Sequence, residues 1–278
     1  MTLLHLVGLE NSGHHLWFPT IENLAHHCGR KFVQEHDNIE HMSQRQDEKA
    51  VKSQLRNGGQ EVLIFWNSFP SNWSERRDTL SQLKNSKIYN IAWDLQVVDE
   101  LKRDENITVI PRYLYLDRDR FDMMAGKCDL DYPPVEGQSC IHTHTIVMQK
   151  FLALIGHVFE SIKSNHPGIW TSINMDWLHV PKQCEAMFRD LVTFLAWDID
   201  RCDLAAACAA VDLPAPKFSA LNKEPNLASI CADLNFVEDQ MSSVKEIADI
   251  PVLGGQRRFK SYDETKLSER KAFCESLP

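Results

Sequence analysis

The sequence predicts an α/β fold in which buried strands alternate with amphipathic helices. The first observation is an apolar run at 3–7, followed by a glycine-bounded loop and then by apolar positions at helical spacing from Trp17 onward. The second is the run 61–66, which is nearly all apolar, as in strands that are buried on both faces of a parallel sheet. The third is the stretch 145–163, where apolar side chains keep helical spacing and predict a long core-packing helix.

The same patterns predict the elements along the whole chain. The predicted strands are 3–7, 61–66, 88–92, 108–110, 113–116 and 170–178. The predicted helices are 17–28, 74–83, 97–102, 145–163, 181–195, 199–211, 227–236 and 237–247. Pro111 predicts a bend or an edge strand, because proline cannot donate a ladder hydrogen bond. We expect one domain over 1–278, with a core over about 1–211 and a helical and looped C-terminal extension over 212–278.

Composition excludes several classes of protein. The hydrophobic share of 43% and the charged share of 25% are ordinary for a globular domain. The net charge of −9 argues against a general nucleic-acid binder, which needs a basic face. No signal peptide or membrane-spanning run is visible, so we expect a cytoplasmic protein without a membrane segment.

Cysteines and histidines give no metal signature. Eight cysteines occur without a Cys-x-x-Cys pair or zinc-ligand spacing. Cys184, Cys202 and Cys208 fall in expected helices, where buried free thiols are common, so we expect reduced cysteines. One or two disulfides of a secretory-pathway protein are the alternative. The histidines at positions 26 to 41 are irregularly spaced and lack a completing carboxylate or cysteine, so we expect no metal.

The loop after the first strand, Gly8–His15, predicts an anion site. Its amides and the following helix N-terminus converge, and unpaired N–H groups and the helix dipole both favour negative charge. Gly8 and Gly13 have the spacing of the phosphate loop G-x-x-x-x-G-K-[ST]. However, His14 and His15 stand where that motif has Lys and Ser or Thr.

Three segments resemble the sulfotransferase family. The loop is similar to the family's G-x-x-x-S-G-T-T-x-L, with the Thr pair replaced by His and the usual Lys or Arg replaced by Asn11. Residues 114–122 are similar to an apolar strand followed by R-D-P-x-D, with Arg118 in the Arg position and Gly126 where the family has Ser. Residues 173–197 follow the family's strand, turn and helix closing on F-L-G, with Ala196 in place of Gly.

The resemblance implies a divergent sulfotransferase with a three-layer α/β/α fold and a mostly parallel central sheet, related to that of P-loop NTPases. It implies 3′-phosphoadenosine 5′-phosphosulfate as donor, no metal, and a hydroxyl or amine of a small-molecule or glycan acceptor. The implied nucleotide-binding residues are Gly8, Asn11, Ser12, Gly13, His14, His15, Leu16, Arg118, Gly126, Arg257 and Arg258. Many Golgi members carry an N-terminal anchor, so the Golgi lumen is the alternative to the cytoplasm.

Sulfuryl transfer also needs a base that takes the acceptor's proton. The candidate catalytic residues are Glu10, His14, His15, His142 and His144, of which His14 or His15, when protonated, could replace the missing lysine.

Two polar residues are candidate substrate contacts, and two other functions are alternatives to sulfuryl transfer. Asn67 and Ser68 follow the second strand, and they either contact substrate at its carboxyl end or cap the next helix. A nucleotide-kinase type of P-loop protein is one alternative function, although no Lys-Ser/Thr pair follows Gly13. A nucleotide-binding module without catalysis is the other, favoured by the departures at Asn11, Ser68 and Gly126.

Overall fold

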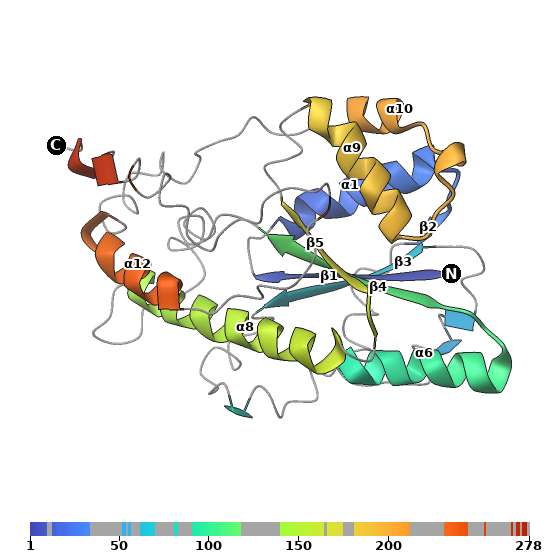
Figure 1. Cartoon of the computed structure of the whole chain (residues 1–278), viewed down its shortest axis with the longest axis horizontal. Helices are drawn as coiled ribbons and strands as arrows, with labels where there is room; N and C mark the ends of the chain where they lie inside the picture. The colour runs from blue at the N-terminus through green and yellow to red at the C-terminus, as the bar shows by residue number, and fades with distance from the viewer. Residues whose placement is uncertain are drawn as a thin grey trace.

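The computed structural model describes most of the predicted core. The described residues are 1–9, 13–33, 52–53, 55–56, 62–69, 81–82, 91–117, 140–163, 166–174, 181–211, 231–243, 253, 268, 271–272 and 274–276. Within these ranges the chain has an α/β fold built on a parallel sheet, as predicted (Figure 1).

Over the described ranges the sheet has five strands in the order β2-β3-β1-β4-β5, and every neighbouring pair runs parallel. The strands are β1 (Thr2–Leu9), β2 (Phe32–Val33), β3 (Val62–Phe69), β4 (Ile110–Asp117) and β5 (Trp170–Asn174). β1 is the central strand, and the predicted burial of its apolar run is confirmed. Leu3, Leu4, Leu6 and Val7 are each at most 1% exposed.

Helices pack against both faces of the sheet. The helices with described bounds are α1 (His14–His27), α6 (Ile91–Glu105), α8 (Cys140–Lys163), α9 (Pro181–Phe194), α10 (Leu204–Ala209), α12 (Leu234–Ser243) and the short 3-10 helix η3 (Ile199–Arg201), of which α12 packs on α8. Successive strand residues point to opposite faces. Leu4 and Leu6 of β1 therefore join a core with α1, α9 and α10, while Leu3 joins a second core with α6. On this second face, Phe159 of α8 meets Trp170 of β5 with 5.6 Å between ring centroids.

Two strand predictions are wrong in their extent. β3 continues to Phe69, so Asn67 and Ser68 are the sixth and seventh residues of the strand rather than the start of a loop. The short strand expected at 88–92 is contradicted at 91–92, where α6 begins. A short apolar run cannot be assigned by periodicity alone, and here Leu95, Val98 and Leu101 are buried and continue it at helical spacing along α6.

Pro111 causes neither a bend between two strands nor an edge strand. It is the second residue of β4, which lies between β1 and β5. The Ile110 amide bonds to Met1 on the β1 side, and the Tyr113 amide bonds to Ile169 on the opposite side. Amide directions alternate along a strand, so the Pro111 nitrogen faces the β5 side. β5 pairing begins only at Tyr113, so no ladder hydrogen bond is lost.

The boundaries of three helical regions differ from the predictions. The helix expected at 199–211 is divided into η3 and α10, because Asp198 accepts from the Asp200 amide and Asp203 accepts from the Ala206 amide at 3.0 Å. α8 begins at Cys140 rather than at 145. α12 crosses the boundary expected between 236 and 237, and it packs against α8.

The prediction of reduced thiols is wrong for Cys184, Cys202 and Cys208. Every cysteine side chain that is described belongs to a disulfide, and the pairs are Cys28–Cys202, Cys184–Cys208 and Cys231–Cys274. The first two join α1 and α9 to the η3–α10 region around the same core. Spacing along the sequence did not predict them, because the partners of the first pair are 174 residues apart.

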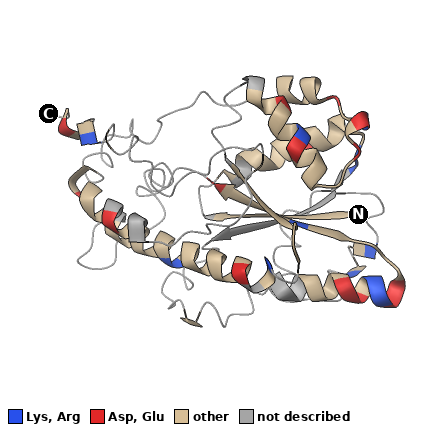
Figure 2. Ribbon diagram, in the orientation of Figure 1, with Lys and Arg blue, Asp and Glu red and all other residues tan. Residues whose placement is uncertain are grey.

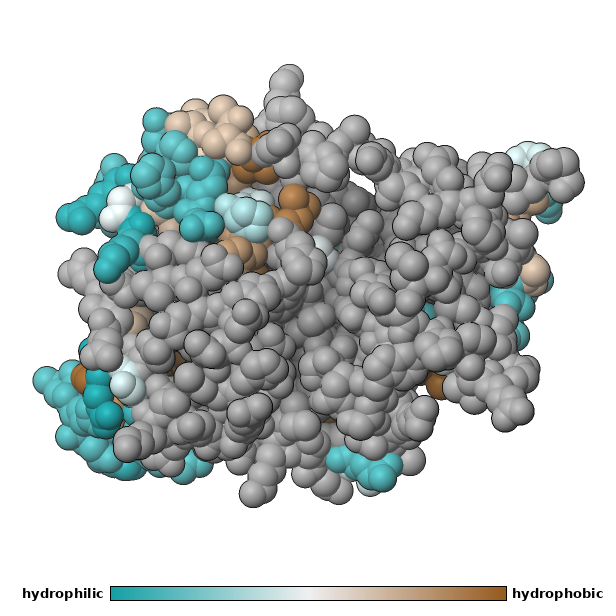
Figure 3. Space-filling model, turned by 180° about the vertical axis from the view of Figure 1, so that it is seen from behind, coloured by the Kyte–Doolittle hydropathy of each residue, from teal (hydrophilic) through white to brown (hydrophobic). Residues whose placement is uncertain are grey.

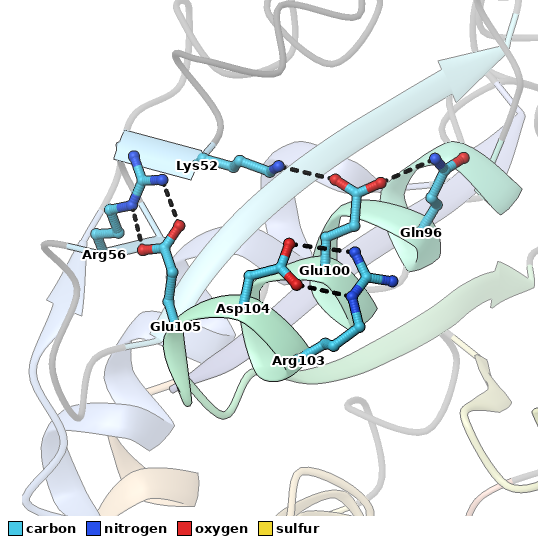
Figure 4. A network of polar contacts seen from close by, with 7 residues as sticks. All are labelled: Lys52, Arg56, Gln96, Glu100, Arg103, Asp104 and Glu105. Atoms are coloured by element: carbon cyan, nitrogen blue, oxygen red, sulfur yellow. Dashed lines mark hydrogen bonds and ion pairs between the residues drawn. The ribbon is translucent and has the colours of Figure 1, made fainter.

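Charged residues gather at the end of α6. Figure 2 shows them there as alternating blue and red, and the reverse view in Figure 3 shows a hydrophilic corner at the same place. Lys52 and Arg56 form ion pairs with Glu100 and Glu105 of α6 (Figure 4). The Arg56–Glu105 pair is exposed and contributes little stability, whereas the Lys52–Glu100 pair is partly buried. Leu55, between Lys52 and Arg56, is 2% exposed and holds this segment to the α6 core. Across the part of the chain that the structure describes, no helix is long and apolar enough to cross a membrane.

Candidate functional site

The connections of the sheet place a topological switch point between the carboxyl ends of β1 and β4. From β1 the chain passes through α1 to β2 on one side of β1, whereas from β4 it passes through α8 to β5 on the other side. α1 and α8 lie on opposite faces of the sheet. Neighbouring strands whose connections leave in opposite directions mark the switch point, where open α/β sheets bind ligands.

The N-terminus of α1 lies at this switch point. Gly13 is its N-cap, with φ 98° and ψ 24°, a left-handed conformation that glycine adopts without strain. The Gly13 carbonyl accepts hydrogen bonds from the amides of Leu16 and Trp17, both at 2.9 Å. The amides of His14 and His15 belong to the first turn and have no acceptor within the helix.

Two further features of this helix end suit an anion. Gly13 has no side chain, and no side chain that the structure describes caps the helix with a hydrogen bond. The first turn also contains no acidic residue that would neutralise the positive end of the helix dipole. The arrangement can therefore bind a negatively charged group through backbone amides. The Leu16 side chain packs against the core and its amide already bonds to Gly13, so it adds no donor.

The other strand ends converge on this region as expected. Gly8 of β1 lies directly beside Ser68 of β3, and Val7 lies beside Asn67. β4 ends at Asp117, so Arg118 is the next residue after the strand that flanks β1 on its other side. The remaining predicted nucleotide and catalytic positions lie outside the described residues: Glu10, Asn11, Ser12, Arg118, Gly126, Arg257 and Arg258.

The two candidate bases of α8 have different surroundings. Both lie inside the helix, because α8 begins at Cys140. His144 is 8% exposed, so it faces the interior. His142 is partly exposed, its Nε2 lies 4.0 Å from Asp233 Oδ1, and its ring packs edge-to-face on Phe236 with 3.9 Å between centroids.

Asp233 and Phe236 are residues that sequence reasoning missed. They lie in the C-terminal part of the chain, which we expected to be an extension of the core, yet α12 packs directly against α8. No local signal connects Asp233 with His142, because ion pairs between residues far apart in sequence leave no periodic pattern. Among the described residues, no group of three or more His, Cys, Asp or Glu side chains could hold a metal ion.

Comparison with models of protein families and with curated proteins finds no match to this chain. An α/β fold by itself does not define an activity, so the function is inferred from the chemistry of the site.

Proposed function

We propose that this protein is a divergent sulfotransferase that transfers a sulfuryl group from 3′-phosphoadenosine 5′-phosphosulfate to a hydroxyl or amine of a small-molecule or glycan acceptor. The observation that carries the proposal is the N-terminus of α1, which has glycine, Gly13, as its N-cap and lies beside the switch point between β1 and β4. The resemblance of residues 8–15 and 114–122 to the family's donor-binding segments supports it. The proposed fold is the family's three-layer arrangement in one domain, and the packing of α12 on α8 supports a single unit.

The residues present fit a nucleotide that carries phosphate and sulfate groups. First-turn amides at His14 and His15 would hold the anionic bridge between the donor's phosphate and sulfate, and Arg118 would hold its 3′-phosphate, because a guanidinium binds phosphate through two parallel hydrogen bonds. The bound nucleotide would supply the sulfuryl group.

Chemistry at this site needs charge stabilisation and a base. As the acceptor oxygen or nitrogen bonds to sulfur, the sulfur–oxygen bond to the nucleotide breaks, and negative charge grows on the departing phosphate oxygen. The α1 N-terminus would stabilise that charge, helped by a protonated His14 or His15. The acceptor's proton would pass to Glu10, His15, His142 or His144. Of these, His142 has a carboxylate partner in Asp233.

We further propose that the protein works in an oxidising compartment, such as the Golgi lumen. Three disulfides support this location over the cytoplasm, because cytosolic glutathione and thioredoxin keep most thiols reduced.

The test is calorimetric titration with adenosine 3′,5′-bisphosphate, the nucleotide product. We expect wild-type protein to bind it with a Kd on the order of 1 μM. Arg118→Ala should weaken binding at least about tenfold, because it removes charge-assisted hydrogen bonds to phosphate. Arg201→Ala is the matched control, since this arginine is exposed on η3 and forms an ion pair with the nearby Asp198.

Other outcomes would replace the proposal with one of its alternatives. Failure of the wild type to bind the bisphosphate, together with binding of a nucleoside triphosphate and Mg²⁺, would indicate the nucleotide-kinase type of protein. Binding of the bisphosphate without sulfuryl transfer to any acceptor in a broad screen of alcohols, amines and glycans would indicate a nucleotide-binding module.

A further inference from the structure

Two N-x-Ser/Thr sequences occur in the chain, the acceptor pattern for N-linked glycosylation. One is Asn106-Ile107-Thr108, in which the middle residue is not proline and the third is threonine. The other, Asn72-Trp73-Ser74, lies outside the described residues. Such short sequences occur by chance, so the position of Asn106 in the fold decides whether it can carry a glycan.

Asn106 occupies an exposed turn that can accommodate a large substituent. It directly follows the last residue of α6, and it has φ 56°, a left-handed conformation that asparagine tolerates better than most residues. Both Asn106 and Thr108 are exposed. In contrast, Ile107 packs against the α6 core and Val109 is 6% exposed. The turn is therefore anchored by its apolar residues while the acceptor asparagine points away from the core.

The turn lies at the amino ends of the parallel strands, opposite the carboxyl ends where the candidate site lies. It precedes the first residue of β4, whereas the switch point follows the last residue of that strand (Figure 1). An eight-residue strand spans roughly 25 Å. A glycan on Asn106 would leave the switch point accessible, and it would extend from the hydrophilic corner at the end of α6 (Figure 3).

We propose that Asn106 is an N-glycosylation site. The proposal rests on the oxidising compartment inferred above, because the secretory pathway that forms the three disulfides also transfers oligosaccharides to asparagine. The co-substrate is an oligosaccharide linked to a lipid diphosphate. The Asn106 amide nitrogen bonds to the anomeric carbon of the first sugar, and the bond from that carbon to the diphosphate oxygen breaks. The lipid diphosphate leaves with the electron pair, and the amide proton passes to a base.

The experiment uses the full chain made in the secretory pathway of a eukaryotic cell, carrying Asn72→Gln so that one acceptor sequence remains. Intact mass is measured before and after treatment with peptide N-glycosidase, which converts a glycosylated asparagine to aspartate. We expect the enzyme to remove the mass of one oligosaccharide and to leave aspartate at position 106. Thr108→Val should abolish this mass shift, whereas Thr108→Ser keeps the acceptor sequence and should retain it.

Asn106→Gly provides a second variant that tests the site without straining the fold. Glycine adopts the left-handed conformation freely, so this variant should fold and lose the glycan completely. The proposal is overturned if folded, disulfide-bonded protein carries unmodified Asn106, or if Thr108→Val and Thr108→Ser have the same glycan mass. Titration of the same samples with adenosine 3′,5′-bisphosphate separates the two proposals, because donor binding should be equal before and after glycan removal.

Discussion

A buried histidine sits in the middle of the central strand. His5 is 0% exposed and stacks on Tyr113 with 4.4 Å between ring centroids, and Tyr113 stacks on Trp170 at 4.9 Å. The three residues are direct partners in the β1–β4 and β4–β5 registers, so the stack runs across three strands. Burial lowers the pKa of His5 to about 3, because the imidazolium would lose its hydration inside the core.

The first prediction concerns the pH dependence of stability. In the unfolded chain His5 binds a proton below its ordinary pKa of 6.5, whereas in the folded chain it stays neutral down to about pH 3. The unfolded state therefore binds more protons in this window, and His5 should lower the free energy of unfolding by about 1.4 kcal/mol for each unit of falling pH. Urea unfolding at several pH values between 7 and 4 measures this slope.

His5→Phe isolates the contribution of His5 from that of other titrating groups. Phenylalanine keeps a flat ring in the stack with Tyr113 but cannot be protonated. The variant should lose the part of the slope that belongs to His5, so that its advantage over wild type grows as the pH falls. Parallel curves for the two proteins would contradict a neutral, buried His5.

At the scale of elements, two helices end in the same motif with different residues. α1 ends with Gly29 at φ 62°, where the amides of Gly29 and Arg30 bond to the carbonyls of His26 and Ala25. α9 ends with Ala196 at φ 57°, where the amides of Ala196 and Trp197 bond to Thr193 and Val192. Both are Schellman motifs, and this left-handed position favours glycine. Ala196 is also where the resemblance to sulfotransferases implied a glycine.

The second prediction is that the two helix ends respond in opposite directions to exchange of glycine and alanine. Ala196→Gly should stabilise the protein by about 0.5 to 1 kcal/mol, because relief of the left-handed strain exceeds the added entropy of the unfolded chain. Gly29→Ala should destabilise it by about 1 kcal/mol. No atom lies within 4 Å of a Cβ built at Gly29, so backbone strain alone would act there. Thermal and urea unfolding of both variants provide the test, and changes of equal sign would contradict it.

At the scale of the whole molecule, one disulfide closes most of the chain into a loop. Cys28–Cys202 joins residues 174 positions apart, and beside it the Asp203 amide donates to the His27 carbonyl at 3.0 Å. Asn23 of α1 also donates to the Ala207 carbonyl of α10 at 2.8 Å. The end of α1, whose other end forms the candidate anion site, is therefore held by covalent and polar contacts to a segment late in the sequence.

The third prediction ranks the disulfides by the chain length they close. Replacing Cys28 and Cys202 together by alanine should lower the free energy of unfolding by about 4 to 5 kcal/mol, because the crosslink restricts a long loop in the unfolded state. Replacing Cys184 and Cys208, which are 24 residues apart, should cost about 3 kcal/mol. Denaturant unfolding under non-reducing conditions measures both, and equal or reversed losses would contradict loop closure as the main cause.

Prediction from the sequence worked where burial repeats along a single element. The type of three elements was predicted correctly because the burial of each one is visible in its own residues. They are β1, from its apolar run, α1, from the glycine before it, and α8, from its apolar spacing. Their ends were predicted less well, because the ends depend on caps such as Asp203 and on continued pairing such as Ser68 with Gly8. The convergence of strand ends near Gly8 and Gly13 was predictable, since parallel strands share a carboxyl edge.

The sequence by itself therefore determined the α/β class, the parallel sheet and a glycine-bounded helix N-terminus suited to an anion. Only the tertiary structure decided the strand order, the switch point between β1 and β4, the pairing of Cys28 with Cys202 and the approach of Asp233 to His142. The physical reason is that periodicity records whether a residue is buried, whereas contacts between distant residues depend on how all the elements pack together.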